Sequence, residues 1–205
     1  MDDEIYEWCL YEYIQSADNV GPENLVISNI DVSVLTDFRK DLVKDKLKGV
    51  YLTTTSLRKS LKPENEEFHS ALLVELNIAP SRVAVLDEKG TFDLAPEDSD
   101  RLDAVVFGGI LGDDPPKDAS QQLRTLGLSC CCLEKEQMST DTAVITTKRI
   151  LVDKIKITDL MFVSRPEFNV NKHEKVELPF RYLKNPDGSI LASKDIIRLT
   201  KEESF

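Results

Sequence analysis

The first segment of the chain has the spacing of an amphipathic helix. Between Asp3 and Ala17, apolar side chains recur at helical intervals with acidic side chains between them, and that period is typical of an α-helix with one buried face. The pattern predicts a helix over residues 3–17 whose apolar stripe belongs to the core. The stripe is Ile5, Trp8, Cys9 and Tyr13, and the intervening acids are Glu4, Glu7 and Glu12.

Short apolar runs further along the chain predict strands. Each contains four to six residues, many of them β-branched, and is bounded by polar residues, glycine or proline, as expected for buried strands of a sheet. The predicted strands cover residues 24–28, 83–86, 104–107 and 128–133. Residues 51–61 stay open, because Tyr51–Thr55 has strand propensity while Ser56–Leu61 is also compatible with a helix start.

Helices are predicted between and after these strands. The firmest covers residues 140–151, where five apolar or methyl-bearing side chains share one helical face. A solvent-facing helix is predicted over residues 37–47, anchored by Phe38, Leu42 and Leu47, and a short one over residues 117–126. Because apolar strands alternate with helices, the sequence predicts an α/β fold with a mainly parallel sheet.

The pattern changes after Phe162. Residues 164–182 are polar with spaced aromatic side chains, and Asn185-Pro186-Asp187-Gly188 is a turn signal. We interpret residues 1–163 as the main domain and residues 164–205 as an ordered extension that packs on it near the functional site. The last residues of the chain are expected to fray.

Composition narrows the class of protein. The chain has 205 residues, of which 41% are hydrophobic and 31% charged, as in one medium-sized globular domain. It contains no run of about 20 apolar residues, and it starts with Met1-Asp2-Asp3-Glu4, so neither a membrane span nor a secretory signal is predicted.

The cysteines and histidines predict neither disulfides nor a metal site. Cys130, Cys131 and Cys132 are consecutive, and neighbours along a strand point to opposite faces. His69 and His173 stand far apart in the sequence, without the spacing of zinc ligands. We therefore expect a reduced, cytoplasmic compartment and no metal.

The charge of the chain favours a basic partner. The chain has 26 basic and 37 acidic residues, a net charge of −11. A field of this sign attracts a basic protein and repels a phosphate backbone. Residues 87–103 alone contain seven acids, which we interpret as a solvated acidic face or loop.

A glycine cluster marks the expected site. Gly108, Gly109 and Gly112 directly follow a predicted buried strand. Glycine there lets the backbone approach a ligand, and ligands of parallel sheets bind outside the carboxyl ends of strands. The structural alternative is a tight turn that needs glycine only for its geometry. A dinucleotide site with Glu134 as the ribose-binding acid fits less well, because the order is Gly-Gly-x-x-Gly and Asp113 and Asp114 would repel phosphates.

A second loop leads into the firmest predicted helix. Ser139, Thr140 and Asp141 are all residue types that cap helix N-termini. The free N–H groups of a helix N-terminus also bind carboxylates. Two such loops at adjacent strand ends are suited to holding a zwitterionic amino-acid ligand between them.

Three ordered motifs resemble a known family. Residues 106–116, 137–143 and 178–182 are similar to segments of the fungal SPOUT-class methyltransferases that modify one arginine of a small-subunit ribosomal protein. The likeness extends over most of the chain. The chain departs from the family pattern at its start, where the family has a strand of roughly Tyr-Ile-Ile-Glu-His and this sequence passes into the helix predicted over residues 3–17.

The resemblance implies an α/β fold with a deep trefoil knot, a single domain with a C-terminal extension, and a protein that works as a monomer. It also implies S-adenosyl-L-methionine as cofactor, held in a bent form with its adenine among backbone groups of the knot loops. The cofactor-binding residues that it implies are Phe107, Gly108, Gly109, Gly112, Leu133, Gln137, Met138, Ser139, Thr140, Thr142 and Ala143.

The implied chemistry needs carboxylates rather than a metal. Methyl transfer from a sulfonium is an in-line displacement, so the protein has to position the reactants and place charge. An arginine acceptor stays protonated, so acids are needed to bind it and to take up the released proton. We favour Asp113 and Glu167 over Asp114 and Glu177 for these roles. Phe180 and Tyr182 are candidates for stacking on the guanidinium, although core packing is the commoner role of such side chains.

Two other functions stay open at this point. Many knotted methyltransferases act on RNA, but a chain at −11 without a basic cluster lacks the electrostatic signature of an RNA-binding protein. A non-catalytic adaptor that keeps a cofactor pocket is the third interpretation. A basic ribosomal protein of the small subunit is the partner we expect.

Overall fold

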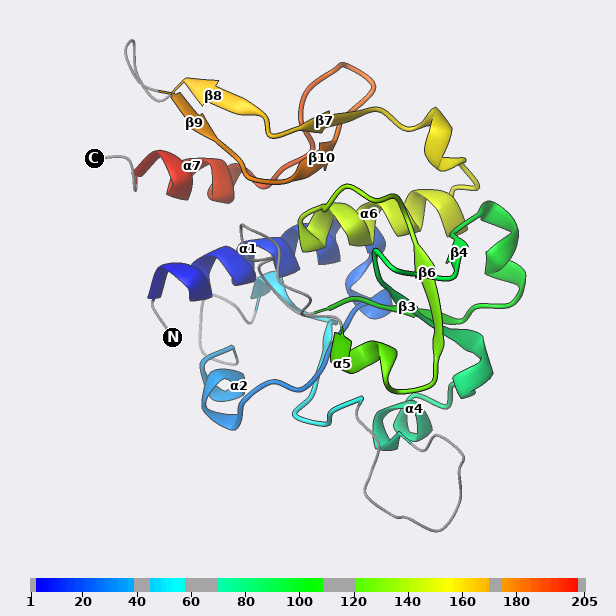
Figure 1. Cartoon of the computed structure of the whole chain (residues 1–205). Helices are drawn as coiled ribbons and strands as arrows, with labels where there is room; N and C mark the ends of the chain where they lie inside the picture. Colours follow the sequence, from blue (N-terminus) through cyan, green and yellow to red (C-terminus); the bar gives the residue numbers. More distant parts are fainter. Residues whose placement is uncertain (1–2, 39–44, 58–69, 109–120, 170–174, 203–205) are drawn as a thin grey trace.

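The computed structural model describes residues 3–38, 45–57, 70–108, 121–169 and 175–202. Its centre is a parallel four-stranded sheet, with helices on both faces and a C-terminal extension on top (Figure 1). The α-helices are α1 (Asp3–Val20), α2 (Val32–Phe38), α4 (Ala71–Glu75), α5 (Gln121–Arg124), α6 (Thr140–Leu151) and α7 (Lys194–Glu202).

The strands are short, and most contain two to four residues. They are β1 (Val26–Ile27), β2 (Tyr51–Leu52), β3 (Val83–Leu86), β4 (Phe92–Asp93), β5 (Ala104–Val106), β6 (Ser129–Cys132), β7 (Phe162–Ser164), β8 (Glu167–Asn169), β9 (Lys175–Glu177) and β10 (Arg181–Leu183). Four 3-10 helices connect them: η1 (Pro22–Asn24), η2 (Pro80–Arg82), η3 (Pro96–Asp100) and η4 (Ile157–Asp159).

The central sheet has the strand order β4-β6-β3-β5, and all of its pairs are parallel. This confirms the predicted α/β class and three of the predicted strands. The central strand β3 is apolar throughout and Val83, Ala84 and Val85 are fully buried, because both faces of a parallel sheet are covered. The predicted helix over 140–151 is also confirmed, with the same bounds.

Each face of the sheet has its own apolar cluster. On one face, Ala84 and Cys131 pack with Ala143 and Ile150 of α6. On the other, Val83 and Val85 pack with residues of α4, and Leu123 of α5 borders this cluster. Cys130 lies at the second cluster and Cys131 in the first, so neighbouring cysteines point to opposite faces, and all four cysteines are free.

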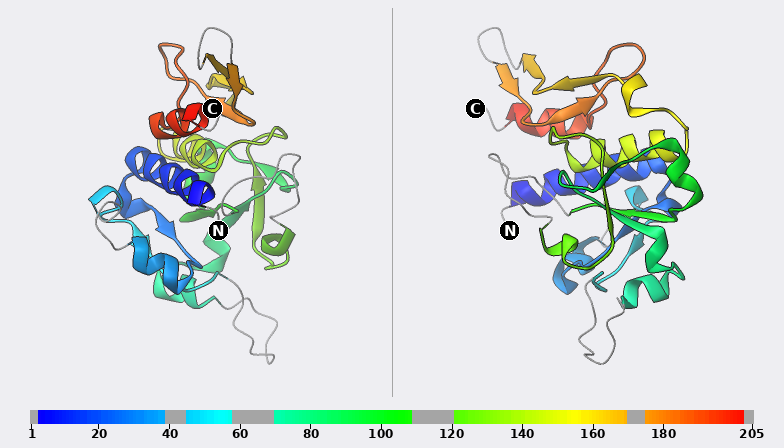
Figure 2. Two further views of the ribbon diagram at one scale, coloured as in Figure 1. Left: turned by 90° about the vertical axis from the view of Figure 1, so that its left-hand side faces the viewer. Right: turned by 45° about the vertical axis from the view of Figure 1, so that its right-hand side comes forward.

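The N-terminal helix was predicted well, but the segment after it was predicted only in part. Helix α1 extends three residues beyond the predicted end, and it lies alongside α6 in both views of Figure 2. Strand β1 pairs in parallel with β2, which settles the open segment at Tyr51 as a strand. The strand predicted over 24–28 is present as β1, but only half of it is buried, since Ile27 is buried and Val26 is 37% exposed.

The helix predicted over residues 37–47 is supported at its two ends, where Asp37, Phe38, Asp45 and Lys46 are helical, and a helical stretch before it was not predicted. Helix α2 starts at Val32 and ends at Phe38, and residues 39–44 lie outside the described part of the chain. The start is fixed by Asp31, whose Oδ1 accepts hydrogen bonds from the backbone N–H of Ser33 at 2.8 Å and from its hydroxyl at 2.5 Å. This is helix capping by an aspartate, which the periodicity of the apolar residues did not reveal. Of the predicted anchors, only Leu47 has a described side chain, and it is buried.

The extension consists of two antiparallel strand pairs and a helix. Strand β7 pairs with β10 and β8 with β9, and α7 follows β10 in the chain. Leu178, Phe180, Tyr182 and Ile196 form its buried cluster, and Trp8 and Tyr11 of α1 pack against them. Residues of this C-terminal part therefore pack on α1, and β7 lies across the boundary predicted at residues 163 and 164.

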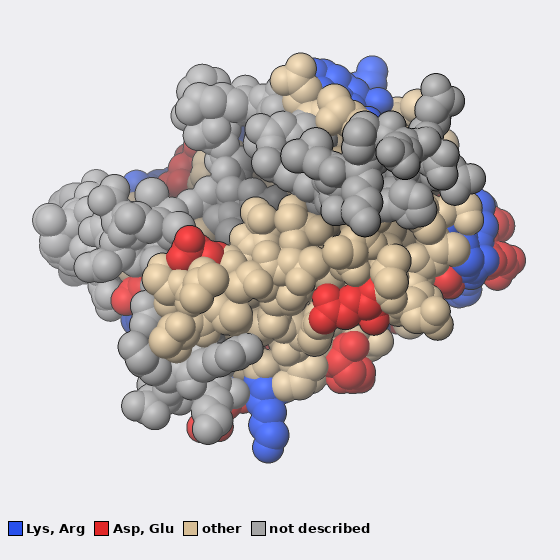
Figure 3. Space-filling model, turned by 90° about the horizontal axis from the view of Figure 1, so that it is seen from below, with Lys and Arg blue, Asp and Glu red and all other residues tan. Residues whose placement is uncertain are grey.

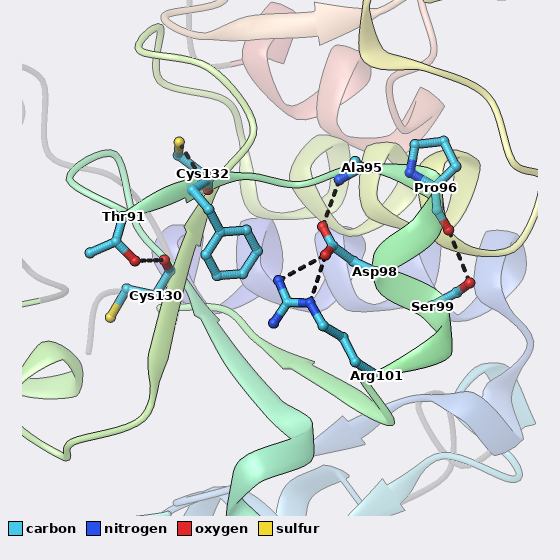
Figure 4. A network of polar contacts seen from close by, with 9 residues as sticks. Thr91, Ala95, Pro96, Asp98, Ser99, Arg101, Cys130 and Cys132 are labelled. Carbon is cyan, nitrogen blue, oxygen red and sulfur yellow. Dashed lines mark hydrogen bonds and ion pairs between the residues drawn. The ribbon is translucent and has the colours of Figure 1, made fainter.

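The acidic stretch 87–103 is more structured than predicted. It forms β4 and η3, and Figure 4 shows its polar contacts. Asp98 accepts hydrogen bonds from the backbone N–H of Ala95 and from Nε of Arg101, both at 2.8 Å. Asp87 is also buried. The other five acids of the stretch are exposed, so the interpretation as a solvated acidic face holds for them and fails for Asp87 and Asp98.

The surface of the described residues shows dispersed charges. On the face in Figure 3, acidic and basic side chains form small separate groups around an uncharged centre. Across the described ranges, no helix is long and apolar enough to cross a membrane. The described residues of this face therefore form no continuous basic surface of the kind that binds a phosphate backbone.

Gly90 is required by a close backbone approach. A Cβ at this position would lie 2.3 Å from the carbonyl carbon of Cys131 and 2.7 Å from the nitrogen of Cys132. We predict that Gly90→Ala lowers the free energy of unfolding by about 2 kcal/mol, because overpacking against the backbone of β6 forces a shift. Urea denaturation measures this change. Gly108→Ala is the control, since nothing lies within 4 Å of its Cβ position; equal stability of the two variants would contradict the prediction.

Candidate active site

The residues that follow three of the parallel strands lie at one edge of the sheet. Strand β3 ends before Asp87, β5 before Phe107 and β6 before Leu133. Because these strands are parallel and adjacent, their carboxyl ends meet at the same edge. This edge is where parallel sheets bind ligands, and both loops that the sequence singled out begin here.

Asp87 lies between the two loops. Its side chain is fully buried, its Oδ2 lies 2.6 Å from Nη1 of Arg124, and its Oδ1 accepts a hydrogen bond from the backbone N–H of Lys89 at 2.7 Å. A buried carboxylate is tolerated when it is paired in this way. Sequence analysis did not single out Asp87 as a site residue, although its place directly after a buried strand was a usable signal.

The apolar part of the site comes from both loops. Leu133 and Ala143 belong to the buried cluster on the α6 side of the sheet, and Phe107 and Met138 are half-buried and pack against it. Four residues predicted from the two loops are therefore brought together. Beside them, a Cβ at Gly108 would meet no heavy atom of the described residues within 4 Å, so these residues leave space at this glycine.

The loop between β6 and α6 runs beside β10. The backbone N–H of Arg181 donates a hydrogen bond to the carbonyl of Gln137 at 3.1 Å, and Met138 forms an isolated parallel bridge with Arg181. The extension thus borders the same loop that the sequence predicts to bind the cofactor.

The N-terminus of α6 has a buried polar arrangement. Ser139 is the N-cap residue, and its hydroxyl donates to Oδ1 of Asp141 at 2.5 Å and lies 2.8 Å from Oγ1 of Thr142. The backbone N–H of Thr142 donates to the same Oδ1 at 2.7 Å. The carboxylate of Asp141 therefore satisfies the first turn of the helix, where an acid is also favoured by the helix dipole. Thr140 is the first helical residue and is half-buried.

A second carboxyl group from α1 lies beside Asp141. Glu12 is 3% exposed and Asp141 is fully buried, and Nε1 of Trp8 donates to Oε1 of Glu12 at 2.9 Å. Tyr182 of β10 completes the group; its hydroxyl is buried and has no hydrogen-bond partner among the described residues, and Oδ2 of Asp141 has none either. Polar groups of α1, α6 and β10 are thus buried together near the N-terminus of α6.

Burial controls the protonation of this cluster. Desolvation, and then the charge of Asp141, raises the pKa of Glu12 from 4.5 to about 8, while hydrogen bonds from Trp8 and Thr140 act in the opposite direction. Desolvation also raises the pKa of Asp141, to about 6, against the hydrogen bonds from Ser139 and Thr142. Burial raises the pKa of Tyr182 as well. Among the described residues, no cation contributes to the pKa shifts of the two carboxyl groups, so the pair holds a proton at neutral pH.

Sequence analysis misplaced Glu12. It was interpreted as part of the polar side of the helix, yet it follows Trp8 by four residues and Cys9 by three, which puts it on the buried face. That spacing was the available signal. Arg181 was likewise not a candidate, although it lies within one of the motifs that carry the family resemblance.

The sequence predicted two catalytic acids, Asp113 and Glu167. Asp113, together with Gly109 and Gly112, falls within residues 109–120, which lie outside the described part of the chain. Glu167 is on β8, where its Oε2 lies 2.8 Å from Nζ of Lys175 and its side chain is 51% exposed. Both roles stay predictions.

Comparison with known proteins identifies the family. The model of the family described as "SFM1-like: Protein arginine N-methyltransferase SFM1-like" matches residues 1–205. Protein arginine N-methyltransferase SFM1 of Saccharomyces cerevisiae is 38% identical over 208 residues, covering 100% of this chain and 92% of the yeast protein. The chain belongs to the SFM1-like protein arginine N-methyltransferase family. The resemblance to arginine methyltransferases drawn from the motifs is thereby confirmed.

Solved structures agree with this assignment. The crystal structure of the yeast arginine methyltransferase SFM1 complexed with SAH matches the SFM1-like chain with a TM-score of 0.80 and 35% identity, covering 95% of this chain and 88% of that one. The corresponding complex with SAM matches with a TM-score of 0.79 and 34% identity, covering 97% of this chain and 85% of that one. The fold described above is therefore that of the solved relatives.

The buried carboxyl pair generates a prediction for stability. The folded state of this SFM1-like chain keeps the Glu12 proton up to about pH 8, whereas the unfolded state loses it near 4.5. The free energy of unfolding therefore falls as pH rises between these values. Glutamine carries no titratable proton. We therefore predict that Glu12→Gln removes the pH-dependent part of the free energy of unfolding that Glu12 causes, on the order of a few kcal/mol, and flattens the curve of stability against pH.

Urea denaturation at several pH values between 4.5 and 8 measures the slope. Glu7→Gln is the matched control, because Glu7 lies on the same helix and is exposed, and it should keep the wild-type slope. An unchanged slope in Glu12→Gln would show that the buried carboxyl does not retain its proton.

Proposed function

We propose that this chain binds S-adenosyl-L-methionine and transfers its methyl group to an arginine side chain of a basic ribosomal protein of the small subunit. Membership of the SFM1-like family supports the transfer to arginine. The motif resemblance supports the ribosomal substrate, the SPOUT class and action as a monomer in the cytoplasm. The observation that carries the cofactor proposal is the convergence of the two loops beside open space at Gly108.

The described residues fit the cofactor. Leu133 and Ala143 offer buried apolar surface, Phe107 and Met138 offer half-buried apolar surface, and Gly108 has no side chain to fill the adjoining space. Gln137, Ser139, Thr140 and Thr142 supply polar groups around the same loop. Bound there, S-adenosyl-L-methionine supplies an electrophilic methyl group, so this chain's own residues have to bind and orient the acceptor.

The acceptor arginine requires negative charge and a route for its proton. A guanidinium carries its charge at neutral pH, and a carboxylate next to it forms charge-assisted hydrogen bonds that orient the reacting nitrogen. Asp113, which directly follows Gly112, is the acid we propose for this role, and Glu167 is the second candidate. The trefoil knot implied by the resemblance stays a prediction as well.

The charge of the chain favours protein over RNA as the substrate. A net charge of −11 attracts a lysine- and arginine-rich protein and repels a nucleic acid backbone. We predict that methyl-labelled S-adenosyl-L-methionine, incubated with this chain and purified ribosomal small subunits, labels a protein band and leaves the RNA unlabelled. Label in the RNA fraction alone would contradict the arginine proposal, and acid hydrolysis of the labelled band identifies the methylated residue.

The space at Gly108 generates a test of the cofactor site. We predict that Gly108→Val keeps the wild-type fold, because the Cβ at this position meets none of the described residues within 4 Å, and weakens cofactor binding about tenfold or more by blocking the close approach of the ligand to the backbone. Isothermal titration calorimetry with S-adenosyl-L-methionine measures the affinity, and circular dichroism checks the fold. Gly108→Ala, which adds a single methyl group, should lose less affinity. Wild-type affinity in Gly108→Val would remove this loop from the site.

A further inference from the structure

One side chain links the extension to the candidate cofactor loop. Arg181 is the first residue of β10, and its side chain is only 15% exposed. Its guanidinium forms an ion pair with the carboxylate of Glu134, its Nε lies 3.7 Å from Oε2 of Glu136, and its Cζ lies 4.0 Å from the centre of the Phe162 ring. We call Glu134, Glu136 and Phe162 the guanidinium cage.

The members of the guanidinium cage come from two separate parts of the chain. Glu134 and Glu136 belong to the loop between β6 and α6, whereas Phe162 is on β7, the antiparallel partner of β10. The side chain of Arg181 therefore joins the loop to a strand pair of the extension. In the described part of the chain, the hydrogen bond from Arg181 to Gln137 is the only backbone hydrogen bond from the extension to residues 134–138.

The cage matches the chemistry of a guanidinium. A planar guanidinium pairs with carboxylates along its edge and stacks its face on an aromatic ring at the same time. Partial burial lowers the pKa of Arg181 from its ordinary value, and a guanidinium still keeps its charge at neutral pH. Without that charge, Glu134 and Glu136 would repel each other, and the loop would lose its fixed attachment to β10.

We propose that Arg181 is a positioning residue for the methyl transfer: its guanidinium holds residues 134–138 in the conformation that binds the cofactor, and the cage around it is a guanidinium-binding site. This inference rests on the proposed function, because the loop matters for activity only if it binds the cofactor. The inference assigns a role to Arg181 and its guanidinium cage, none of which is among the site residues predicted from the sequence.

The test replaces Arg181 by alanine and then adds guanidinium ion to the solution in place of the lost side-chain group. Arg181→Ala is expected to bind S-adenosyl-L-methionine about tenfold more weakly, since hydrogen bonds to charged groups contribute on that scale. Its KM for the cofactor should rise, while turnover at saturating cofactor stays close to wild type. Guanidinium chloride at about 20 mM, far below the molar range in which it unfolds proteins, should restore the affinity at constant ionic strength.

Controls separate positioning from charge and from general stability. Sodium chloride and ammonium chloride at the same ionic strength should not restore the affinity, because neither cation has a planar set of donors. Arg181→Lys should recover less affinity than guanidinium does, for the same reason. Arg165→Ala is the matched variant: Arg165 pairs with Glu177 within the extension, and its loss should leave cofactor affinity unchanged.

Each outcome decides one of the two proposals. If the wild-type chain fails to bind the cofactor, the proposed function fails. If the wild type binds and Arg181→Ala binds equally well, or if sodium chloride rescues it as well as guanidinium does, the inference about Arg181 is overturned while the proposed function stands. If Arg181→Ala does not fold, Glu134→Gln decides: wild-type cofactor affinity in that variant contradicts the inference, and a loss that guanidinium does not restore supports it.

Discussion

The contact between α1 and α6 determines the arrangement of the site. Helix α6 carries the end of the candidate cofactor loop, and its first turn is held by Asp141, whose carboxyl group is fully buried. Glu12 of α1 lies beside it and is also buried. Two carboxyl groups buried without a described cation are tolerated only if one of them keeps its proton and hydrogen bonds stabilise the other. The packing of these two helices is therefore tied to a protonation state.

The C-terminal extension adds a third side to this arrangement. Trp8 of α1 donates to Glu12 and also packs against the buried cluster of the extension. Tyr182 of the same cluster points its hydroxyl to the buried region near Asp141, whose charge helps to raise the pKa of the tyrosine. Movement of the extension would therefore alter the surroundings of the first turn of α6. The extension is a structural part of the site rather than an appendage.

The sequence predicted the elements whose signal is local. The apolar runs at Val83–Leu86 and Ala104–Val106, and the helical period of Thr140–Leu151, each reflect burial of the element itself, and all three lie where they were predicted. The glycine cluster and the helix-capping residues marked the two loops, and the family resemblance added a third motif in the extension. Strands β8 and β9 were not predicted, because three-residue strands with polar exposed sides leave almost no periodic signal.

Other features depend on long-range contacts that no local pattern contains. Glu12 is buried because α6 and the extension cover it, and Asp87 is buried because Arg124 pairs with it from 37 residues away. Asp31 caps the start of α2, a helical stretch that the apolar spacing did not predict. Polar residues were thus the main source of error, since a polar side chain is assigned to solvent by default unless a partner is known.

Arg181 also reduces the repulsion between acidic side chains on the candidate cofactor loop. An enzyme that attracts arginine needs carboxylates near its site, but carboxylates on one short loop repel each other and leave the loop without a fixed conformation. Glu134 and Glu136 are separated by one residue, and both face the guanidinium of Arg181. A resident guanidinium offsets their repulsion with the same planar chemistry that the acceptor arginine offers. Binding an external arginine with acids is thus compatible with an ordered loop, because the positive charge of Arg181 offsets part of the negative charge of Glu134 and Glu136.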